Sequence, residues 1–194
     1  AVVINSGNAN ACTGERGDRD AVAMTQRVAD RLGCAARDVQ VCSTGVIGAP
    51  LPMQAVEAGI DAAFDALEKG TMKDFGEAIC TTDTRPKVRG IELELGGRTI
   101  RIAGCSKGAG MIHPNMATML GVVVTDAPVD PDDLDRLWRG VCDRSFNAIT
   151  IDGDTSTNDT ALLLASGAIG GPPVTGTELD FLEAAIEEVA GELA

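Results

Sequence analysis

Apolar and polar residues alternate along two neighbouring stretches between Val88 and Ala103. In the first stretch isoleucine and leucine alternate with glutamate, in the second two isoleucines flank Arg101, and Gly96-Gly97 separates them. A period of two places successive side chains on opposite faces of a strand, and a glycine pair suits the left-handed backbone of a tight turn. The pattern therefore predicts a β-hairpin.

Apolar residues recur at helical spacing in four other segments. They are 18–32, which Gly33 ends; a segment opened by Pro50 and Pro52 that reaches Leu67 and is closed by Gly70; Pro131–Arg144; and Thr177–Leu193. A fifth, shorter helix is expected to carry 161–165, with Ser156 as its N-cap and Asp159 in the capping-box position.

Short apolar runs bounded by turn residues predict the remaining strands. The expected strands are 2–4, 39–42, 79–81, 119–124 and 148–151. The first leads into a loop of Gly, Asn and Ser, and the second into a turn at 43–48. Because strands and helices alternate, we expect an α/β fold with mixed sheets flanked by helices, in one compact unit.

The charge balance narrows the possible partners. The chain has 194 residues, with 16 Lys and Arg against 29 Asp and Glu, a net charge of −13. Nucleic acids and anionic membranes attract basic surfaces, so we expect neither as a partner. No apolar run approaches the roughly 18 residues of a membrane-spanning helix. The first residues show no signal-peptide pattern and resemble the middle of a strand, so we expect a cytoplasmic protein whose chain begins inside a longer one.

Cysteine and histidine offer little conventional site chemistry. No two of the six cysteines form a CxxC pair, which argues against a zinc site, and we expect small buried thiols in a reduced protein. His113 is the single histidine, so any triad with a histidine base would have to use it. There is no tyrosine to act as an acid or base.

One stretch suggests a different mechanism. The segment 104–118 is rich in glycine, carries the single cation Lys107, and ends in Ala117-Thr118 at the entry to an apolar strand. It lacks the spacing of a P-loop. A threonine placed this way suits an N-terminal nucleophile, whose hydroxyl attacks the preceding carbonyl, cuts the chain and frees an α-amine as base. Such an amine has a pKa near 8, so it needs no histidine. Periodicity alone favours an ordinary threonine in a strand.

Five stretches in order resemble one family. KGAGMIHPNMATML resembles the cleavage-site motif of the ornithine acetyltransferase family, and NSGNANACTG, VCSTGVIG, TTDT and DGDTSTNDT resemble its other signatures. The resemblance implies a two-sheet layered α/β sandwich that cuts itself between Ala117 and Thr118. Residues 1–117 would then belong to the α chain and residues 118–194 would begin the β chain.

The resemblance also implies the activity and the site. Thr118 would be the nucleophile of a ping-pong transfer of acetyl from N-acetylornithine to glutamate, and Thr44 and Gly45 would form the oxyanion hole. Thr81 and Lys107 would bind substrate, with the neighbouring Thr82 as an alternative to Thr81 and with the lysine pairing with the α-carboxylate. No metal and no cofactor are implied, and whether acetyl-CoA is a second acetyl donor stays open. The α and β chains would associate as a heterotetramer of two α and two β chains, or as a higher oligomer.

Two further features favour structural roles. Asp152, Asp154, Ser156 and Asn158 alternate as in a calcium loop, but Thr157 and Leu163 stand where an EF-hand needs glycine and glutamate. We therefore expect a turn and helix cap there. His113 is followed by Pro114, and we expect it to support the loop before the cleavage point.

Two other functions remain open from the sequence. A self-cleaving aminopeptidase or amidase of related architecture would use water as the acyl acceptor, and Lys107 argues against it because a cation suits a carboxylate substrate. A non-catalytic domain that has kept the fold would leave the bond between Ala117 and Thr118 intact.

Overall fold

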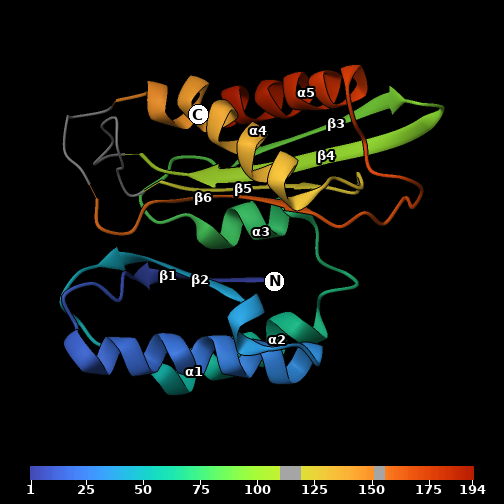
Figure 1. The fold of residues 1–194 in the computed structure, drawn as a ribbon. Helices are drawn as coiled ribbons and strands as arrows, with labels where there is room; N and C mark the ends of the chain where they lie inside the picture. Colours follow the sequence, from blue (N-terminus) through green and yellow to red (C-terminus); the bar gives the residue numbers. More distant parts are fainter. Residues whose placement is uncertain (110–118, 151–155) are drawn as a thin grey trace. The chain divides into compact units, whose positions relative to one another are not determined.

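The computed structural model describes residues 1–109, 119–150 and 156–194. The chain divides into two compact units, Ala1–Thr81 and Thr82–Ala194, and each is described by itself. Both contain helices packed on a sheet (Figure 1). The expected α/β class with mixed sheets flanked by helices is confirmed, whereas the expected division of the chain at Ala117–Thr118 stays a prediction.

The first unit is built on a parallel βαβ crossover. Strand β1 (Val2–Asn8) runs parallel to β2 (Gln40–Val46), and α1 (Gly14–Leu32) connects them. The helix ends at Gly33, whose φ of 71° lies in the left-handed region that glycine adopts readily. Both strands are longer than expected, because their polar ends, where Ser6 pairs with Thr44, continue the ladder beyond the apolar run.

Two helices cover one face of this small sheet and a third lies on the other (Figure 1). Helix α2 (Met53–Asp65) packs beside α1, around a core of Met24, Leu51 and Ile60. Ion pairs of Arg27 and Arg31 with Asp61 link the two helices.

Helix α3 (Met72–Ile79) corrects the expected strand at 79–81. A capping box starts the helix, with Thr71 and Asp74 each bonding the other's backbone N–H, and Ile79 is its last, buried residue. The sequence signal was the threonine three residues before an acidic side chain. On the opposite face of the sheet from α1, the hydroxyl of Ser6 donates to the carbonyl of Ala78 at 2.6 Å.

The second unit holds a mixed four-stranded sheet in the order β3-β4-β5-β6. Strands β3 (Lys87–Leu95) and β4 (Arg98–Lys107) form the expected hairpin. Strand β5 (Leu120–Thr125) pairs antiparallel to β4 and parallel to β6 (Thr160–Ala165).

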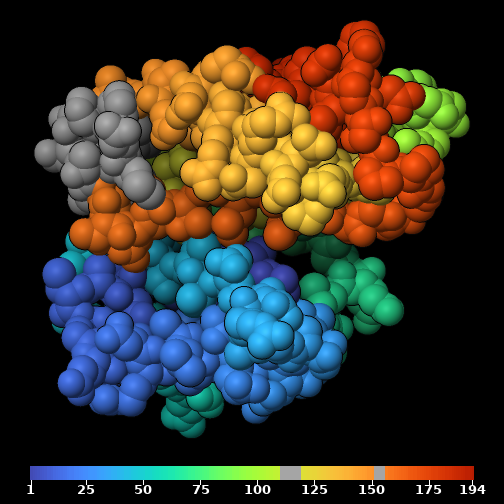
Figure 2. Space-filling model, viewed as in Figure 1, coloured from blue at the N-terminus to red at the C-terminus, as the bar shows by residue number. Residues whose placement is uncertain are grey.

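Helices α4 (Pro131–Arg144) and α5 (Thr177–Leu193) have the expected bounds and lie side by side on one face of the second sheet (Figures 1 and 2). Arg144 joins them through ion pairs with Glu183 and Glu187. Their apolar faces and the sheet enclose the larger core, which includes Ile100, Val123, Leu137, Val141, Leu182 and Ile186.

Two expectations near β6 are wrong. The segment 161–165 is a strand instead of a helix, since it pairs with β5 and completes a β5–α4–β6 crossover. A short apolar run fits either element, and the pairing decides between them. No strand forms over the described part of the expected strand at 148–151. Ala148 is instead the last residue of a 3₁₀ turn, Phe146–Ala148, and Phe146 is buried against the core. Residue 151 lies outside the described residues.

The thiols are less uniform than expected. Cys42 and Cys105 are buried, Cys80 and Cys142 are half-buried, but Cys12 and Cys34 are exposed. Burial raises the pKa of the Cys142 thiol to about 11. Among the helices of the described ranges, none combines the length and apolar character needed to cross a bilayer.

Candidate functional site

The first candidate region is the carboxyl end of β2. Thr44 is wholly buried, and Gly45, which follows it, is exposed. Both lie within the strand, not in the turn beyond it as expected, because the ladder to β1 continues through Ser6 and Gly7. The two expected oxyanion donors therefore lie on a paired strand, which holds a group more firmly than a loop does.

Gly45 is required by its conformation and by its neighbour. Its φ of +130° disfavours any other residue. A Cβ at this position would lie 2.3 Å from the carbonyl carbon of Gly7 and 2.6 Å from the amide nitrogen of Asn8. The backbones of the two strands are therefore in direct contact, and the end of β1 supports Gly45.

Side chains and backbone groups lock these two segments together. The Asn8 amide donates to the carbonyl of Ala49 at 3.0 Å, and the Ser43 hydroxyl donates to the Asn5 side chain at 2.6 Å. The backbone N–H of Ala9 donates to Val46 at 2.9 Å. The end of β1 and the residue that follows it thus support the end of β2.

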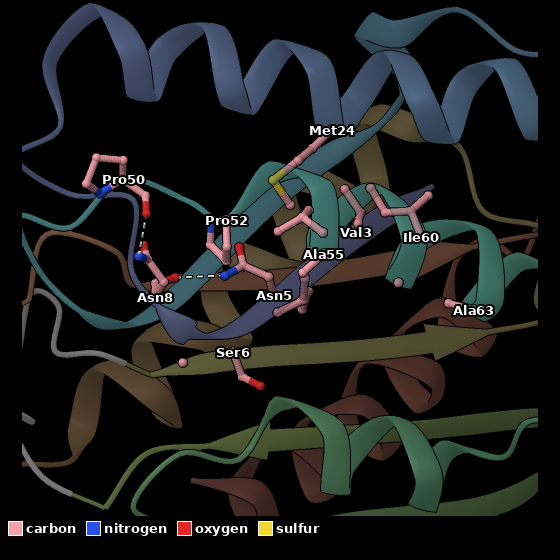
Figure 3. Close-up of a pocket in the computed structure, with 14 residues that line it drawn as sticks. Val3, Asn5, Ser6, Asn8, Met24, Pro50, Pro52, Ala55, Ile60 and Ala63 are labelled. Atoms are coloured by element: carbon pink, nitrogen blue, oxygen red, sulfur yellow. Dashed lines mark hydrogen bonds between the residues drawn. The ribbon is translucent and has the colours of Figure 1, made fainter.

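A cavity of about 710 Å³ lies between β1 and α2 in the same unit (Figure 3). Asn5, Asn8, Met24 and Pro52 are among its lining residues. Of the predicted site residues that the structure describes, namely Thr44, Gly45, Thr81 and Lys107, none lines it. The cavity therefore gives no support to these four residues, and the positions of Thr44, Gly45 and Lys107 are defined by strand register.

Thr81 ends the first unit and is exposed. It follows Cys80, the residue that caps the end of α3. Asp83, in the same TTDT stretch, belongs to the second unit, where its Oδ1 accepts the backbone N–H of Gly108 at 2.7 Å. The stretch therefore contributes residues to both units.

The second candidate region is one end of the four-stranded sheet. Lys107 is the last residue of β4, pairs in register with Leu120, and is 3% exposed. Leu120 in turn pairs with Thr160. Because these registers align, the end of β4 and the beginnings of β5 and β6 meet at the same edge. Lys107 is thus a buried strand residue and not a solvated lysine of the glycine-rich stretch.

Asp159, which was expected only to cap a helix, completes this edge. Its Oδ1 accepts the backbone N–H of Met119 at 2.6 Å, while its Oδ2 is buried and has no hydrogen-bond partner within the described ranges. Burial raises the pKa of the Asp159 carboxyl to about 7, against the opposing effects of the Met119 N–H and the Lys107 charge. The sequence signal for this role is the position of Asp159 directly before β6. That strand pairs in parallel with β5, the strand that follows Thr118.

Several predicted residues lie outside the described residues, namely His113, Ala117, Thr118, Asp152 and Asp154. Of the stretch that resembles a calcium loop, Ser156 and Asn158 are described, and the Ser156 hydroxyl accepts the backbone N–H of Asn158 at 3.1 Å. That turn leads into β6 and not into a helix.

Comparison with known proteins identifies close relatives along the whole chain. A family model described as the ArgJ family matches residues 1–194. The chain is 54% identical over 196 aligned residues to the arginine biosynthesis bifunctional protein ArgJ of Geobacter sulfurreducens, with 100% of this chain and 50% of that protein covered. The chain thus spans about half the length of the curated relatives it matches.

Solved structures agree on the fold. The crystal structure of arginine biosynthesis bifunctional protein ArgJ from Bacillus halodurans is 42% identical, with a TM-score of 0.52 over 60% of this chain and 61% of that one. An L-aminopeptidase D-Ala-esterase/amidase from Ochrobactrum anthropi, described as a variant of the Ntn-hydrolase fold, reaches a TM-score of 0.57 over 90% of this chain and 61% of that one. At 15% identity the second likeness shows the fold alone.

Proposed function

Because the chain belongs to the ArgJ family, we propose that it carries the nucleophile and part of the substrate site of a self-cleaving acyltransferase. The reaction is the transfer of acetyl from N-acetylornithine to glutamate, which gives ornithine and N-acetylglutamate. The protein would thus be a glutamate N-acetyltransferase of arginine biosynthesis.

The observation that carries the proposal is the edge of the second sheet. Lys107, Met119 and Asp159 meet where β5 begins, and Met119 directly follows Thr118 in the chain. A buried ammonium group beside the start of this strand supports binding of an anionic amino acid close to a threonine nucleophile.

Self-cleavage would generate the catalytic group. The Thr118 hydroxyl oxygen attacks the carbonyl carbon of Ala117, the peptide C–N bond breaks, and the nitrogen takes up a proton. Water then hydrolyses the ester, which releases the Ala117 carboxylate and restores the hydroxyl beside a free α-amine. That amine can accept a proton near neutral pH.

Acetyl transfer would follow in two matched steps. With the Thr118 α-amine as base, the hydroxyl attacks the acetyl carbonyl of N-acetylornithine, and ornithine leaves with the proton on its amine. The α-amine of glutamate then attacks the carbonyl carbon of the acetyl ester, the bond between that carbon and the Thr118 oxygen breaks, and a proton from the amine restores the hydroxyl as N-acetylglutamate leaves. The Thr44 hydroxyl and the Gly45 N–H would stabilise the oxyanion in both steps, while Thr81 and Lys107 would bind the amino acid.

The remaining components are proposed on the same basis. The reaction needs no metal and no resident cofactor, and acetyl-CoA is a candidate second acetyl donor. The α and β chains would remain associated as a heterotetramer or a larger oligomer in the cytoplasm.

Cleavage and activity can be tested together on the whole protein. A denaturing gel should show two chains, one of which begins Thr-Met-Leu-Gly on N-terminal sequencing, and the sample should form N-acetylglutamate from N-acetylornithine and glutamate. Thr118→Ala should stay uncut and inactive, whereas Thr118→Ser retains a hydroxyl and should still be cut. A single uncut chain with full activity would refute the mechanism.

The fold shared with the Ochrobactrum amidase makes hydrolysis the main competing reaction. If water were the natural acceptor, acetate would be released from N-acetylornithine at the same rate with and without glutamate. A transferase should show little acetate and a strong dependence on glutamate.

A further inference from the structure

We propose that Asp159 is a positioning residue for the nucleophile, because it holds the backbone N–H of the residue that follows Thr118. This inference rests on the proposed role of Thr118 and assigns Asp159 a part in the same reaction. Asp159 does not have to touch the substrate to act in this way.

Met119 is held through both of its backbone polar groups. Its N–H donates to Asp159 Oδ1 at 2.6 Å, and its carbonyl accepts the N–H of Thr160 at 3.0 Å. The first bond involves a side chain and the second extends the ladder between β5 and β6. The peptide unit between residues 118 and 119 contains the Met119 nitrogen, and peptide units are planar. The bond of 2.6 Å to Asp159 therefore restrains this peptide unit, which links Met119 to the residue before it.

The hydrogen bond between Met119 and Asp159 lies at a partly buried edge of the sheet. Lys107 lies on β4 at the same edge, and its charge favours the ionised form of Asp159. An ionised carboxylate is a stronger acceptor for a backbone N–H than a neutral acid. Among the groups that act on Asp159 here, Lys107 provides the favourable charge and burial opposes it.

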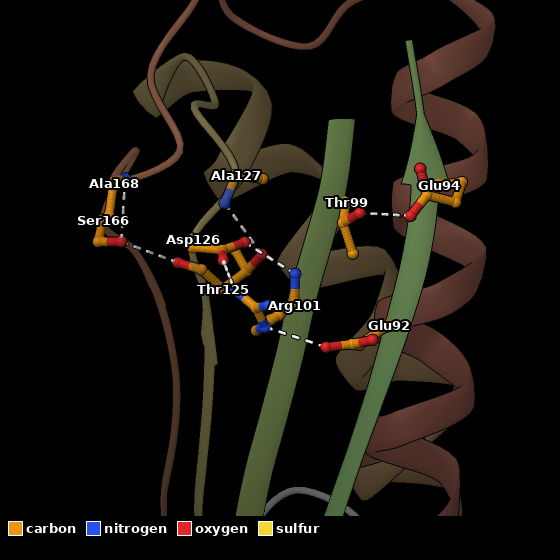
Figure 4. Close-up of polar contacts among 9 residues, drawn as sticks. All are labelled: Glu92, Glu94, Thr99, Arg101, Thr125, Asp126, Ala127, Ser166 and Ala168. Carbon is orange, nitrogen blue, oxygen red and sulfur yellow. Dashed lines mark hydrogen bonds and ion pairs between the residues drawn. The ribbon is translucent and has the colours of Figure 1, made fainter. Parts of the chain in front are cut away.

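The same sheet contains a matched control at its other end. Asp126 directly follows β5, and its Oδ1 accepts the backbone N–H of Arg101 at 2.8 Å (Figure 4). It is also a carboxylate bonded to strand backbone, with an ion pair to Arg101 at 3.9 Å. A general weakening of the sheet should follow from loss of either carboxylate, whereas an effect on Thr118 should follow only from loss of Asp159.

The test compares four variants of the whole protein with wild type: Asp159→Ala, Asp159→Asn, Asp159→Glu and Asp126→Ala. The steady-state kcat, the KM for each substrate, the rate of cleavage and the melting temperature are measured for each. A small misplacement of a reacting group can cost about a hundredfold in rate. We expect Asp159→Ala to lower kcat roughly 10- to 100-fold, to change KM less than about twofold, and to slow cleavage.

The two conservative variants separate position from charge. Asp159→Asn keeps an oxygen at the acceptor position and should stay within about threefold of the wild-type kcat, whereas Asp159→Glu displaces the carboxylate by one methylene and should lose about tenfold. Asp126→Ala should lower the melting temperature about as much as Asp159→Ala and leave kcat unchanged. If Asp159→Ala does not fold, the order of the Asn and Glu variants still decides.

The opposite results are equally clear. A kcat for Asp159→Ala equal to that of Asp126→Ala, a raised KM with unchanged kcat, or a Glu variant more active than the Asn variant would each overturn the positioning role while the wild type remains active. A wild-type protein that neither cuts nor transfers acetyl would overturn the proposed function itself, and the positioning role with it.

Discussion

Each candidate region lies beside a parallel βαβ crossover, one at the carboxyl end of a strand and the other at the amino ends of two strands, and different interactions hold them in place. In the first unit Thr44 and Gly45 lie at the carboxyl end of β2, the second strand of the β1–α1–β2 crossover. In the second unit Met119 and Asp159 precede the amino ends of β5 and β6. The first region is fixed by backbone in contact with backbone, and the second by a half-buried carboxylate and a buried ammonium group.

This difference predicts different sensitivities. A region defined by contact between backbones should fail when an atom is added and should respond little to pH. A region held by buried ionisable groups should instead have a stability that depends on pH. The following substitutions test that contrast.

The largest effect is expected from Gly45→Ala. The new methyl group would meet the Gly7 backbone at 2.3 Å in a conformation with φ of +130°. Overpacking and backbone strain together should cost roughly 2–6 kcal/mol of unfolding free energy. Gly48→Ala is the control, because its φ is +82° but nothing lies within 4 Å of the new atom, and it should cost only about 1–2 kcal/mol. Equal losses in denaturant unfolding would show that the contact with Gly7 is unimportant.

The next effect concerns chemistry at the same place. Thr44→Val removes the hydroxyl while it preserves the volume of a wholly buried side chain. Loss of one oxyanion donor should lower kcat roughly 10²–10³-fold with little change in KM. Thr44→Ser keeps the hydroxyl and should retain most activity. A Val variant with wild-type kcat in a steady-state assay would exclude Thr44 from the site.

Lys107→Met tests the charged region. It removes the ammonium group and keeps much of the buried stem, so KM should rise about 10- to 100-fold for N-acetylornithine and glutamate alike. Both substrates carry the α-carboxylate, and both use one pocket in a ping-pong reaction. An amide analogue without the carboxylate should be nearly indifferent to the substitution. Equal weakening of that analogue would assign Lys107 to supporting the sheet edge.

The smallest expected effect is the pH dependence of stability. The pKa of Asp159 is about 7 in the folded protein, and an unfolded aspartate has a pKa near 3.9. Between these values the folded state keeps a proton that the unfolded state has lost, so stability falls as pH rises through this interval. Asp159→Asn cannot ionise. The stability of this variant relative to wild type should therefore rise by about 1 kcal/mol between pH 5 and pH 8, which corresponds to roughly 2–4 °C of melting temperature. The effect is small because water screens a half-buried carboxylate. A constant difference in melting temperature between the two proteins would contradict the raised pKa.

The local pattern of apolar and polar residues predicts much of the fold. The hairpin and helices α4 and α5 follow from periodicity and clear end signals, such as Pro131 at the first turn of α4. The strand β6 was not predictable in the same way, because a run such as Thr160–Ala165 becomes a strand only by pairing with β5. Helix α3 was missed although the Thr71–Asp74 capping box was present in the sequence.

The candidate site also combines residues that local sequence predicts with residues whose roles depend on strand pairing. Lys107 was found from its motif, but its burial depends on β4 extending to that residue, which the glycine-rich composition concealed. Asp159 was missed because its role follows from the parallel pairing of β5 with β6, and the sequence suggested a helix there. The contact between Gly7 and Gly45 joins residues far apart in the chain, and no local pattern predicts it.

The antiparallel ladder between β4 and β5 changes character if the chain is cut between Ala117 and Thr118. Its two strands, which pair from Ile102–Thr125 to Lys107–Leu120, would then belong to different polypeptides. Refolding after denaturation would change from a unimolecular to a bimolecular process, so its rate and its midpoint should depend on protein concentration. The uncut Thr118→Ala protein should refold at a rate that does not depend on concentration. The kinetic order of refolding therefore reports whether the bond between Ala117 and Thr118 has been cut.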